Sequence, residues 1–281
     1  RKALPEVGYS VQAVESRGDA RAYFEPDGSC ILHIALAPDR VALEAYSDIY
    51  SAGLRSSLRL EDGKGRTIFQ RRKDIPVSLH RSELPAVEGK AFILYDAVPA
   101  TPGPLVVRYR LENTVSKDYS TFEKTLTIPA PGTPAMTEPL LGRRGARIIP
   151  ETEAGPRAFR VGTIQIDPAA GGVFGVDEEA DLFVQLNGLS REVKAGGAFE
   201  AEVRGGGGAP RVLRRPLAEA ADGNILEKLP IKGLAAGAYE VETRLVDATG
   251  KALLKGSCGL TIAAVPPPAD WIVAGTNPTP G

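Results

Sequence analysis

Two stretches of this chain repeat one pattern: GPLVVRYRLEN at residues 103–113 and GAYEVETRLVD at residues 237–247. In each stretch apolar side chains alternate with polar or charged ones, which is the period of a half-buried β-strand. Each continues through a short polar segment to a Leu-Thr-Ile sequence, at residues 126–128 and 260–262. The pattern predicts a strand–turn–strand hairpin that is used twice, once near the end of each of two β-modules.

The same alternation extends outward from these hairpins, for example over residues 30–36 and 54–60. The chain has 31 Gly and 23 Pro, so turn formers are plentiful and long helical runs are few. Only residues 213–229 could hold a helix, and Pro216 and Gly223 would keep it short. Half-buried antiparallel strands at this spacing predict an all-β fold of two tandem immunoglobulin-like antiparallel β-sandwiches.

A proline-rich segment separates the two modules. Residues 129–139 contain four prolines, which favour an extended connection over a central strand. We therefore predict four parts: a first β-sandwich domain at 1–129, a Pro-rich linker at 130–140, a second β-sandwich domain at 141–264 and a Pro-rich extended tail at 265–281.

Composition excludes several classes of function. Lys plus Arg number 34 and Asp plus Glu number 35, for a formal net charge of −1. Without a net basic field we expect no sequence-independent binding to nucleic acid. No apolar run is long enough to span a bilayer, so no membrane-spanning segment is expected.

The chain begins at Arg1 without an initiator Met or a secretory apolar segment, and we expect it to be a portion of a longer protein.

Residues suited to catalysis are scarce. The two histidines, His33 and His80, are far apart, and both are predicted to be ordinary surface residues. Cys30 shares a face with apolar neighbours and Cys258 precedes the last strand; we expect two unpaired thiols, with an inter-domain disulfide as the alternative. No nucleophile elbow or zinc-ligand spacing occurs. We predict no enzyme activity, no catalytic residue, no cofactor and no metal.

Three further features have plain structural interpretations. Gly205–Gly208 lacks the Lys-Ser/Thr of a phosphate loop and is predicted to be a hairpin loop. The acidic cluster Asp177–Asp181 lacks the spacing of a calcium loop, so we interpret it as a polar turn, with calcium binding as the alternative. Basic clusters such as 71–73 and 211–215 have acidic residues nearby and are predicted to be solvated strand or loop faces.

One stretch resembles a known family. LENTVSKDYSTFEKTLTIP, at residues 111–129, resembles a segment of bacterial extracytoplasmic proteins that carry a GWxTD domain, and the resemblance extends over 58–79, 138–142 and 271–278. Gly-Trp-x-Thr-Asp itself does not occur in the chain. The resemblance implies β-sandwich modules beside an uncharacterised GWxTD domain, in exported proteins. It implies an extracytoplasmic location and carries over no reaction or catalytic residue.

The leading hypothesis is a non-enzymatic structural or protein-interaction module that scaffolds or docks other protein chains. The alternatives are a carbohydrate- or peptide-binding module, or an accessory domain of an enzyme whose catalytic part lies outside this chain. Only the first hairpin carries the family signature, so it is the predicted interaction surface, together with the tryptophan of the tail. Its candidate residues are Ser116, Lys117, Asp118, Tyr119 and Trp271.

Overall fold

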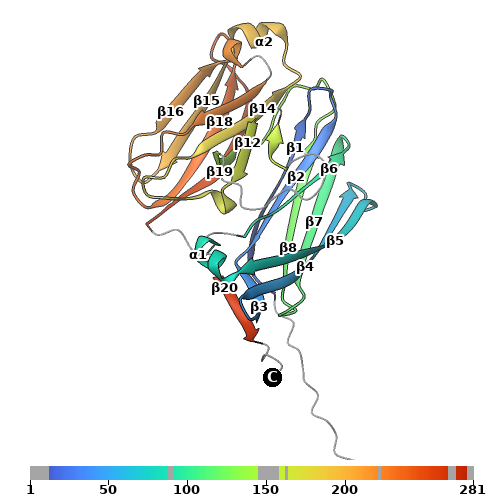
Figure 1. Ribbon diagram of the computed structural model, residues 1–281. Coiled ribbons are helices and arrows are strands. Elements are labelled where there is room, and N and C mark those ends of the chain that lie inside the picture. Colours follow the sequence, from blue (N-terminus) through green and yellow to red (C-terminus); the bar gives the residue numbers. More distant parts are fainter. Residues whose placement is uncertain are drawn as a thin grey trace, which may run out of the picture.

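The computed structural model describes residues 13–87, 92–144, 158–161, 164–220, 223–264 and 270–276. In these residues the chain forms two β-sandwiches that lie side by side, and helices occur only as short turns (Figure 1). The all-β fold class predicted from the sequence is confirmed.

The first sandwich packs a three-stranded sheet against a larger one. Its strands are β1 (Ser16–Phe24), β2 (Cys30–Pro38), β3 (Arg40–Tyr46), β4 (Ile49–Asp62), β5 (Thr67–His80), β6 (Leu94–Ala100), β7 (Gly103–Asn113) and β8 (Tyr119–Ile128), joined by β20 (Asp270–Thr276) from the end of the chain. The small sheet has the order β1-β2-β6, and the large one has the order β20-β3-β4-β7-β8, with β5 on the other side of β4. Between β5 and β6 lie the single turns η1 (Arg81–Glu83) and α1 (Leu84–Val87).

The second sandwich packs two sheets of similar size. Its strands are β9 (Ala135–Met136), β10 (Leu140–Arg144), β11 (Arg160–Val161), β12 (Ile164–Pro168), β13 (Val173–Gly175), β14 (Asp181–Asn187), β15 (Ala198–Gly205), β16 (Arg211–Pro216), β17 (Asn224–Lys228), β18 (Gly237–Val246) and β19 (Ala252–Ala263). Its turns are η2 (Ala170–Gly172), α2 (Arg191–Gly196) and η3 (Leu217–Glu219). One sheet has the order β11-β12-β10-β14-β17, with β9 also on β14, and the other has the order β13-β19-β18-β15-β16.

Both sandwiches use the strand connections of immunoglobulin-like domains. In the first, β5-β4-β7-β8 faces β1-β2-β6; in the second, β16-β15-β18-β19 faces the sheet that contains β12, β14 and β17. The correspondence is strand by strand in chain order, except that β10 is inserted between β12 and β14. The prediction of two tandem immunoglobulin-like sandwiches is therefore confirmed by their topology.

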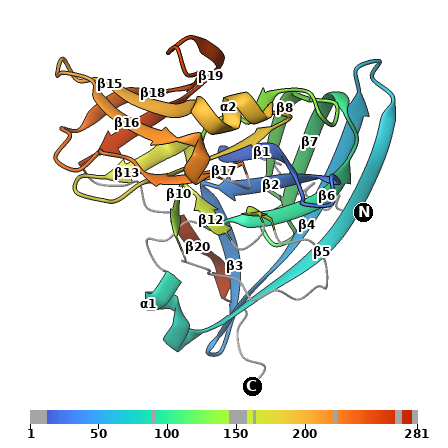
Figure 2. The ribbon, with the colours of Figure 1, turned by 90° about the horizontal axis from the view of Figure 1, so that it is seen from above.

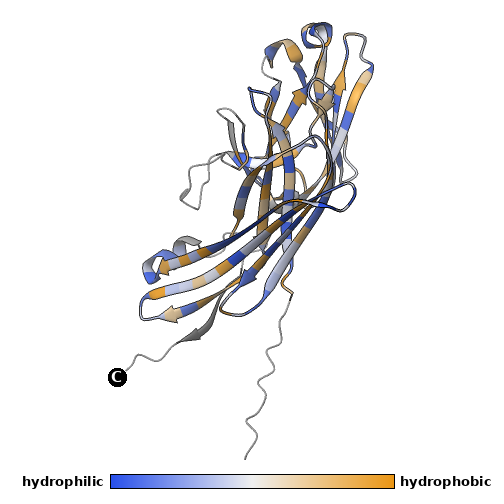
Figure 3. Ribbon diagram, turned by 90° about the vertical axis from the view of Figure 1, so that its right-hand side faces the viewer, coloured by the Kyte–Doolittle hydropathy of each residue, from blue (hydrophilic) through white to orange (hydrophobic). Residues whose placement is uncertain are grey.

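Alternation along the strands builds the two cores. Leu54, Leu58 and Leu60 of β4 are buried in the first core, opposite exposed Arg55 and Arg59. The colours of hydrophobic and hydrophilic residues alternate in the same way along the long strands (Figure 3). A separate cluster fills the second sandwich. Each module therefore buries its own apolar faces, as the period-two pattern predicts.

The repeated sequence corresponds to a repeated hairpin with one register. In the first copy Gly103 pairs with Ile128, and in the second Gly237 pairs with Ile262. Each copy begins at a glycine with positive φ, 122° at Gly103 and 157° at Gly237. The two hairpins, β7–β8 and β18–β19, therefore occupy equivalent places in the two sandwiches.

A third buried cluster joins the sandwiches to each other, and we call it the joint. It consists of Tyr23, Ala35, Leu140, Phe159, Ile166 and Phe183. The first two lie on the β1-β2-β6 sheet and the others belong to the second module, so the outer face of that small sheet is covered. Strand β2 is consequently buried along its whole length.

The joint overturns the prediction that His33 is a surface residue. His33 is 0% exposed, because the face of β2 opposite the first core lies against the second sandwich. Its Nδ1 accepts a hydrogen bond from the backbone N–H of Phe159, and its ring lies edge-on to Tyr23 at 5.1 Å between centroids. Its Nε2 is buried without a hydrogen-bond partner among the described residues. The other histidine, His80, is exposed as predicted and caps η1.

Polar bonds cross between the sandwiches at the edge of this cluster. The side-chain amide of Gln185 accepts from the backbone N–H of Phe24 at 2.7 Å and donates to its carbonyl oxygen at 2.8 Å, as a neighbouring strand would. Arg21 donates to the backbone oxygen of Glu138 at 2.6 Å. Apolar burial and directional bonds together fix how the two modules are oriented.

The local predictions differ from the structure in three places. In its described residues the 213–229 segment holds only the three-residue η3 between strands. The longest helix that the structure describes, α2, begins after Ser190, whose hydroxyl accepts from the backbone N–H of Val193. Within the predicted linker 130–140, β9 already pairs with β14. Within the predicted tail, β20 pairs in parallel with β3. Strand pairing thus extends both sandwiches beyond the limits that proline content suggests.

Candidate functional site

Asn113 organises the tip of the first hairpin, the predicted interaction surface. Its side-chain oxygen accepts from the backbone N–H of Val115 at 2.9 Å and of Ser116 at 3.3 Å. Its own backbone N–H donates to the backbone carbonyl oxygen of Asp118 at 2.8 Å. The turn closes through Lys117, which adopts a φ of 63° that non-glycine residues rarely take. The tip is therefore a defined turn and not a loose loop.

Strand β3 brings the hairpin tip and the C-terminal strand together. Asp118 pairs with Arg40 of β3 at 2.7 Å, and Asn113 Nδ2 donates to the oxygen of Ala42 at 2.9 Å. In the next position of β3, Val41 is the backbone partner of Trp271 in β20. The side chain of Trp271 lies outside the described residues. Asp118 and the backbone of Trp271 thus contact neighbouring positions of one strand, which their sequence separation does not suggest.

The individual roles at the tip are mostly structural. Ser116 Oγ accepts from the backbone N–H of Asp118 at 3.3 Å, and Lys117 is the exposed member. Tyr119 lies under the guanidinium of Arg110, at 4.4 Å from its ring centroid. A crevice beside the tip encloses only about 10 Å³, no more than a water molecule needs. This surface is open to contact with another protein, and its crevice is too small to enclose a ligand larger than a water molecule.

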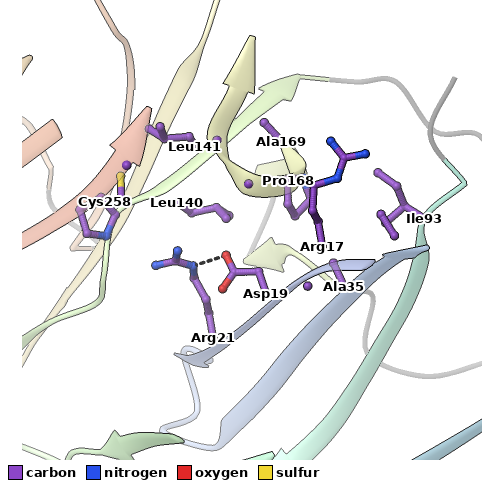
Figure 4. A pocket seen from close by; sticks show the side chains of 16 residues that line it. Arg17, Asp19, Arg21, Ala35, Ile93, Leu140, Leu141, Pro168, Ala169 and Cys258 are labelled. Carbon is purple, nitrogen blue, oxygen red and sulfur yellow. Dashed lines mark hydrogen bonds and ion pairs between the residues drawn. The ribbon is translucent and has the colours of Figure 1, made fainter. Parts of the chain in front are cut away.

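A larger cavity, of about 270 Å³, lies between the two sandwiches (Figure 4). It was not predicted from the sequence. Arg17, Asp19 and Arg21 project into it from β1, opposite residues of β10, η2 and β19. Cavities at domain interfaces are common places for small ligands, and this one is near the lower end of their size range. Arg17, Asp19 and Arg21 are charged residues at alternate positions of the sequence, which predicts that they share one face of a strand. The sequence does not predict that a second domain covers this face.

The charges beside this cavity neutralise one another. Asp19 accepts from Arg21 at 2.8 Å and from Lys124 at 3.2 Å, and Lys124 also pairs with Glu138 at 2.7 Å. Burial opposes ionisation of Asp19, but Arg21 and Lys124 outweigh it and hold the pKa of this carboxyl below its usual range. The cluster is a balanced network that ties β1 and β8 to the start of the second sandwich.

The two cysteines are free thiols, so the disulfide alternative is excluded. Cys30 is buried in the first core, and Cys258 lines the inter-domain cavity. Burial raises the pKa of each thiol to about 11, which keeps both protonated at neutral pH. A protonated thiol is a poor nucleophile. Neither histidine lines the cavity to act as a base for Cys258.

The acidic cluster Asp177–Asp181 is engaged in ion pairs. Glu178 pairs with Arg143 and also accepts from the backbone N–H of Gly175, and Glu179 pairs with Lys228. Hydrogen bonding to Arg143 lowers the pKa of Glu178. Across the described part of the chain, no three His, Cys, Asp or Glu residues come together as metal ligands would. In those same residues, no helix is long and apolar enough to cross a membrane.

Comparison with known proteins names no family. No family model and no curated protein matches the chain. Among solved structures, Salmonella α-2-macroglobulin reacted with methylamine is 9% identical, with a TM-score of 0.33 over 89% of this chain and 24% of that one. The chicken interferon gamma receptor alpha chain is 10% identical, with a TM-score of 0.26 over 89% of this chain and 100% of that one. Bacteroides uniformis β-glucuronidase is 12% identical, with a TM-score of 0.25 over 45% of this chain and 13% of that one. At these TM-scores the matches carry no argument about function.

Proposed function

We propose that this chain is a non-enzymatic structural and protein-interaction module whose two sandwiches act as one rigid body. The observation that carries the proposal is the joint. There the rings of Tyr23 and Phe183, 5.3 Å apart between centroids, pack together from different sandwiches and are almost fully buried. Domains joined only by a linker and a polar interface are free to move, whereas a buried aromatic contact holds them.

Rigidity is what a docking or scaffold protein requires. The Gln185 amide bonds to both backbone groups of Phe24, and a change in domain angle would break the two bonds together. The hairpin tip at Lys117 and the turn at Gly250 in the other sandwich are therefore held at a fixed separation. Surfaces kept in a fixed arrangement bind a partner without the entropy cost of ordering two free domains.

The partners in this proposal are other protein chains outside the cytoplasm. The resemblance of residues 111–129 to proteins that carry a GWxTD domain supports the extracytoplasmic location in this proposal. In this proposal the chain is the accessory β-region beside such a domain. The near-zero net charge argues against nucleic acid as the partner. No cofactor is part of the proposed function.

Affinity purification of the full-length native protein under gentle conditions tests the proposal. We expect defined protein partners to be recovered with the wild-type chain. Phe183→Asp, which places a charge in the joint, should reduce their recovery, whereas Leu253→Asp, at a residue that is 40% exposed, should not. Circular dichroism would establish that both variants keep their β-structure. Recovery of the wild-type chain alone as a monomer would contradict the interaction role, and equal recovery with both variants would contradict the need for a rigid joint.

A further inference from the structure

The outer face of the large sheet in the first sandwich carries a row with two arginines and no acid. Ser57 of β4 pairs in register with Arg72 of β5 on one side and with Arg110 of β7 on the other. These strands lie on the side of the molecule away from the second sandwich (Figure 2). Since adjacent strands are about 4.8 Å apart, the two arginine Cα atoms are about 10 Å apart, with the serine hydroxyl between them.

A hollow of about 280 Å³ lies over this row and is lined by Arg55, Ser57, Arg72, Arg110 and Glu112. Arg72 is exposed and forms no ion pair or hydrogen bond with any residue that the structure describes. The other arginines have partners: Asp74 pairs with Arg55 at 2.9 Å, and Glu112 approaches Arg110 only to 4.0 Å. Three guanidinium groups thus meet two carboxylates, which leaves one positive charge in the hollow.

The side chains around the hollow are already positioned to bind an oxyanion. The Tyr119 ring lies 4.4 Å from the Arg110 guanidinium and limits its motion. Arg72 and Arg110 repel each other across Ser57, and an anion between them would remove that repulsion. Guanidinium groups form paired N–H bonds with carboxylates, and a serine hydroxyl can donate a further bond. One uncompensated positive charge matches a carboxylate better than a phosphate ester, whose charge is about −2.

We infer that the hollow over Ser57 binds the carboxylate of an acidic side chain on a partner protein, between Arg72 and Arg110. This inference rests on the proposed interaction function and names the chemistry of the partner. It also gives the basic cluster at 71–73 a role beyond that of a solvated strand face, because only its central residue points into the hollow. Arg71 is engaged with Asp96 on the inner side.

The test uses a neutral-capped pentapeptide with one glutamate, Ac-GGEGG-amide, and its glutamine counterpart as the probe pair. The readout is the chemical shifts of the arginine Nε–H groups in ¹H–¹⁵N NMR spectra of the ¹⁵N-labelled full chain. We expect the glutamate peptide to shift the signals of Arg72 and Arg110 in a saturable way, and the glutamine peptide to leave them unchanged. Arg72→Gln should weaken binding at least fivefold. Arg191→Gln, which removes one exposed charge in α2, should change it less than twofold.

The other possible results either overturn the carboxylate site or separate it from the proposed interaction function. Equal shifts with the glutamine peptide, or equal weakening by both variants, would overturn the inference, because binding would then not depend on a carboxylate at this row. Native co-purification with the Arg72→Gln variant separates the two proposals. Partners retained by that variant would overturn this site and leave the interaction function in place. Saturable peptide binding by a chain that purifies alone would support the site and contradict the proposed function.

Discussion

The two hairpins β7–β8 and β18–β19 share a register but differ at their tips. In the first, four residues lie between the backbone partners Asn113 and Asp118; in the second, the turn is one residue shorter and runs from Asp247 to Lys251. The second hairpin compensates with a bulge between Leu245 and Val246. The repeated sequence therefore encodes strand pairing and core packing, while the turn is free to change.

The tips also differ in what they touch. Asn113 is buried, and its amide reaches the oxygen of Ala42 in β3. At the corresponding place in the second sandwich, Asp247 bonds only within its own turn, to the N–H groups of Thr249 and Lys251. The first tip is thus part of the sandwich structure and the second is a simple solvent-exposed turn. A repeat can conserve a fold and still give one copy a more elaborate surface.

The sandwiches contribute unlike side chains to the joint, and a pH titration should sharpen this contrast. The second contributes Phe159 and Phe183, whereas the first contributes Tyr23 and the imidazole of His33, which packs against both Tyr23 and Phe159. Burial lowers the pKa of His33 to about 4, from 6.5 in the unfolded chain. The unfolded state therefore takes up a proton first as pH falls, so stability is complete above pH 6.5 and is lost between pH 6.5 and 4. The loss amounts to about 3 kcal/mol, because each pKa unit is worth about 1.4 kcal/mol.

Urea unfolding followed by circular dichroism at pH 7, 5.5 and 4.5 measures this loss. His33→Leu removes the titrating group, so its stability should fall less steeply over the same range. The difference between the two slopes isolates His33 from the carboxyl groups that titrate nearby. Equal slopes for wild type and variant would show that the first sandwich brings no acid-sensitive group to the joint.

The next prediction concerns the capping residues of the two tips. Asn113→Ala leaves the Ala42 oxygen and two turn N–H groups without their side-chain partner. We expect a loss of about 2 kcal/mol in unfolding free energy, the usual cost of an unsatisfied buried polar group. Asp247→Ala removes three turn bonds, but all of them are exposed and water can replace them, so its loss should be clearly smaller. Denaturant unfolding of both variants measures the pair, and equal losses would remove the distinction between a structural tip and a simple turn.

The sequence predicts which residues face a core when local alternation decides it. It misses burial that arises when a second module covers the outer face of a strand. Leu54, Leu58 and Leu60 could be assigned to a core because their period is two and Arg55 lies opposite. His33 could not, since the second face of its strand is buried by another module rather than by its own. The pairing of β20 with β3 joins segments from opposite ends of the chain, and no local pattern encodes it.

The candidate functional residues also divide into those that a local sequence pattern indicates and those that only tertiary packing brings together. The first hairpin could be chosen from its distinctive sequence, and the structure places its four residues together at one tip. The Arg72–Ser57–Arg110 row could not be chosen, because it exists only once β5, β4 and β7 are set in register. The inter-domain cavity beside Arg17 depends in turn on how two whole modules pack. A segment with a distinctive sequence can be chosen as a candidate without the structure, whereas arrangements assembled across strands or domains cannot.

The smallest predicted effect exchanges the turn residues of the two tips. Lys117 has a φ of 63° and Gly250 a φ of 84°, and a Cβ atom added at Gly250 would meet no atom within 4 Å. A left-handed backbone costs a non-glycine residue about 1–2 kcal/mol, and glycine loses about 0.5–1 kcal/mol in extra unfolded-chain entropy. Lys117→Gly should therefore stabilise the first sandwich by about 0.5–1 kcal/mol, and Gly250→Lys should destabilise the second by a similar amount. Calorimetric melting of both variants gives the signs. If Lys117→Gly lowers the melting temperature, the lysine makes a contact that outweighs its strained backbone, and the first tip would be specialised at its most exposed residue as well.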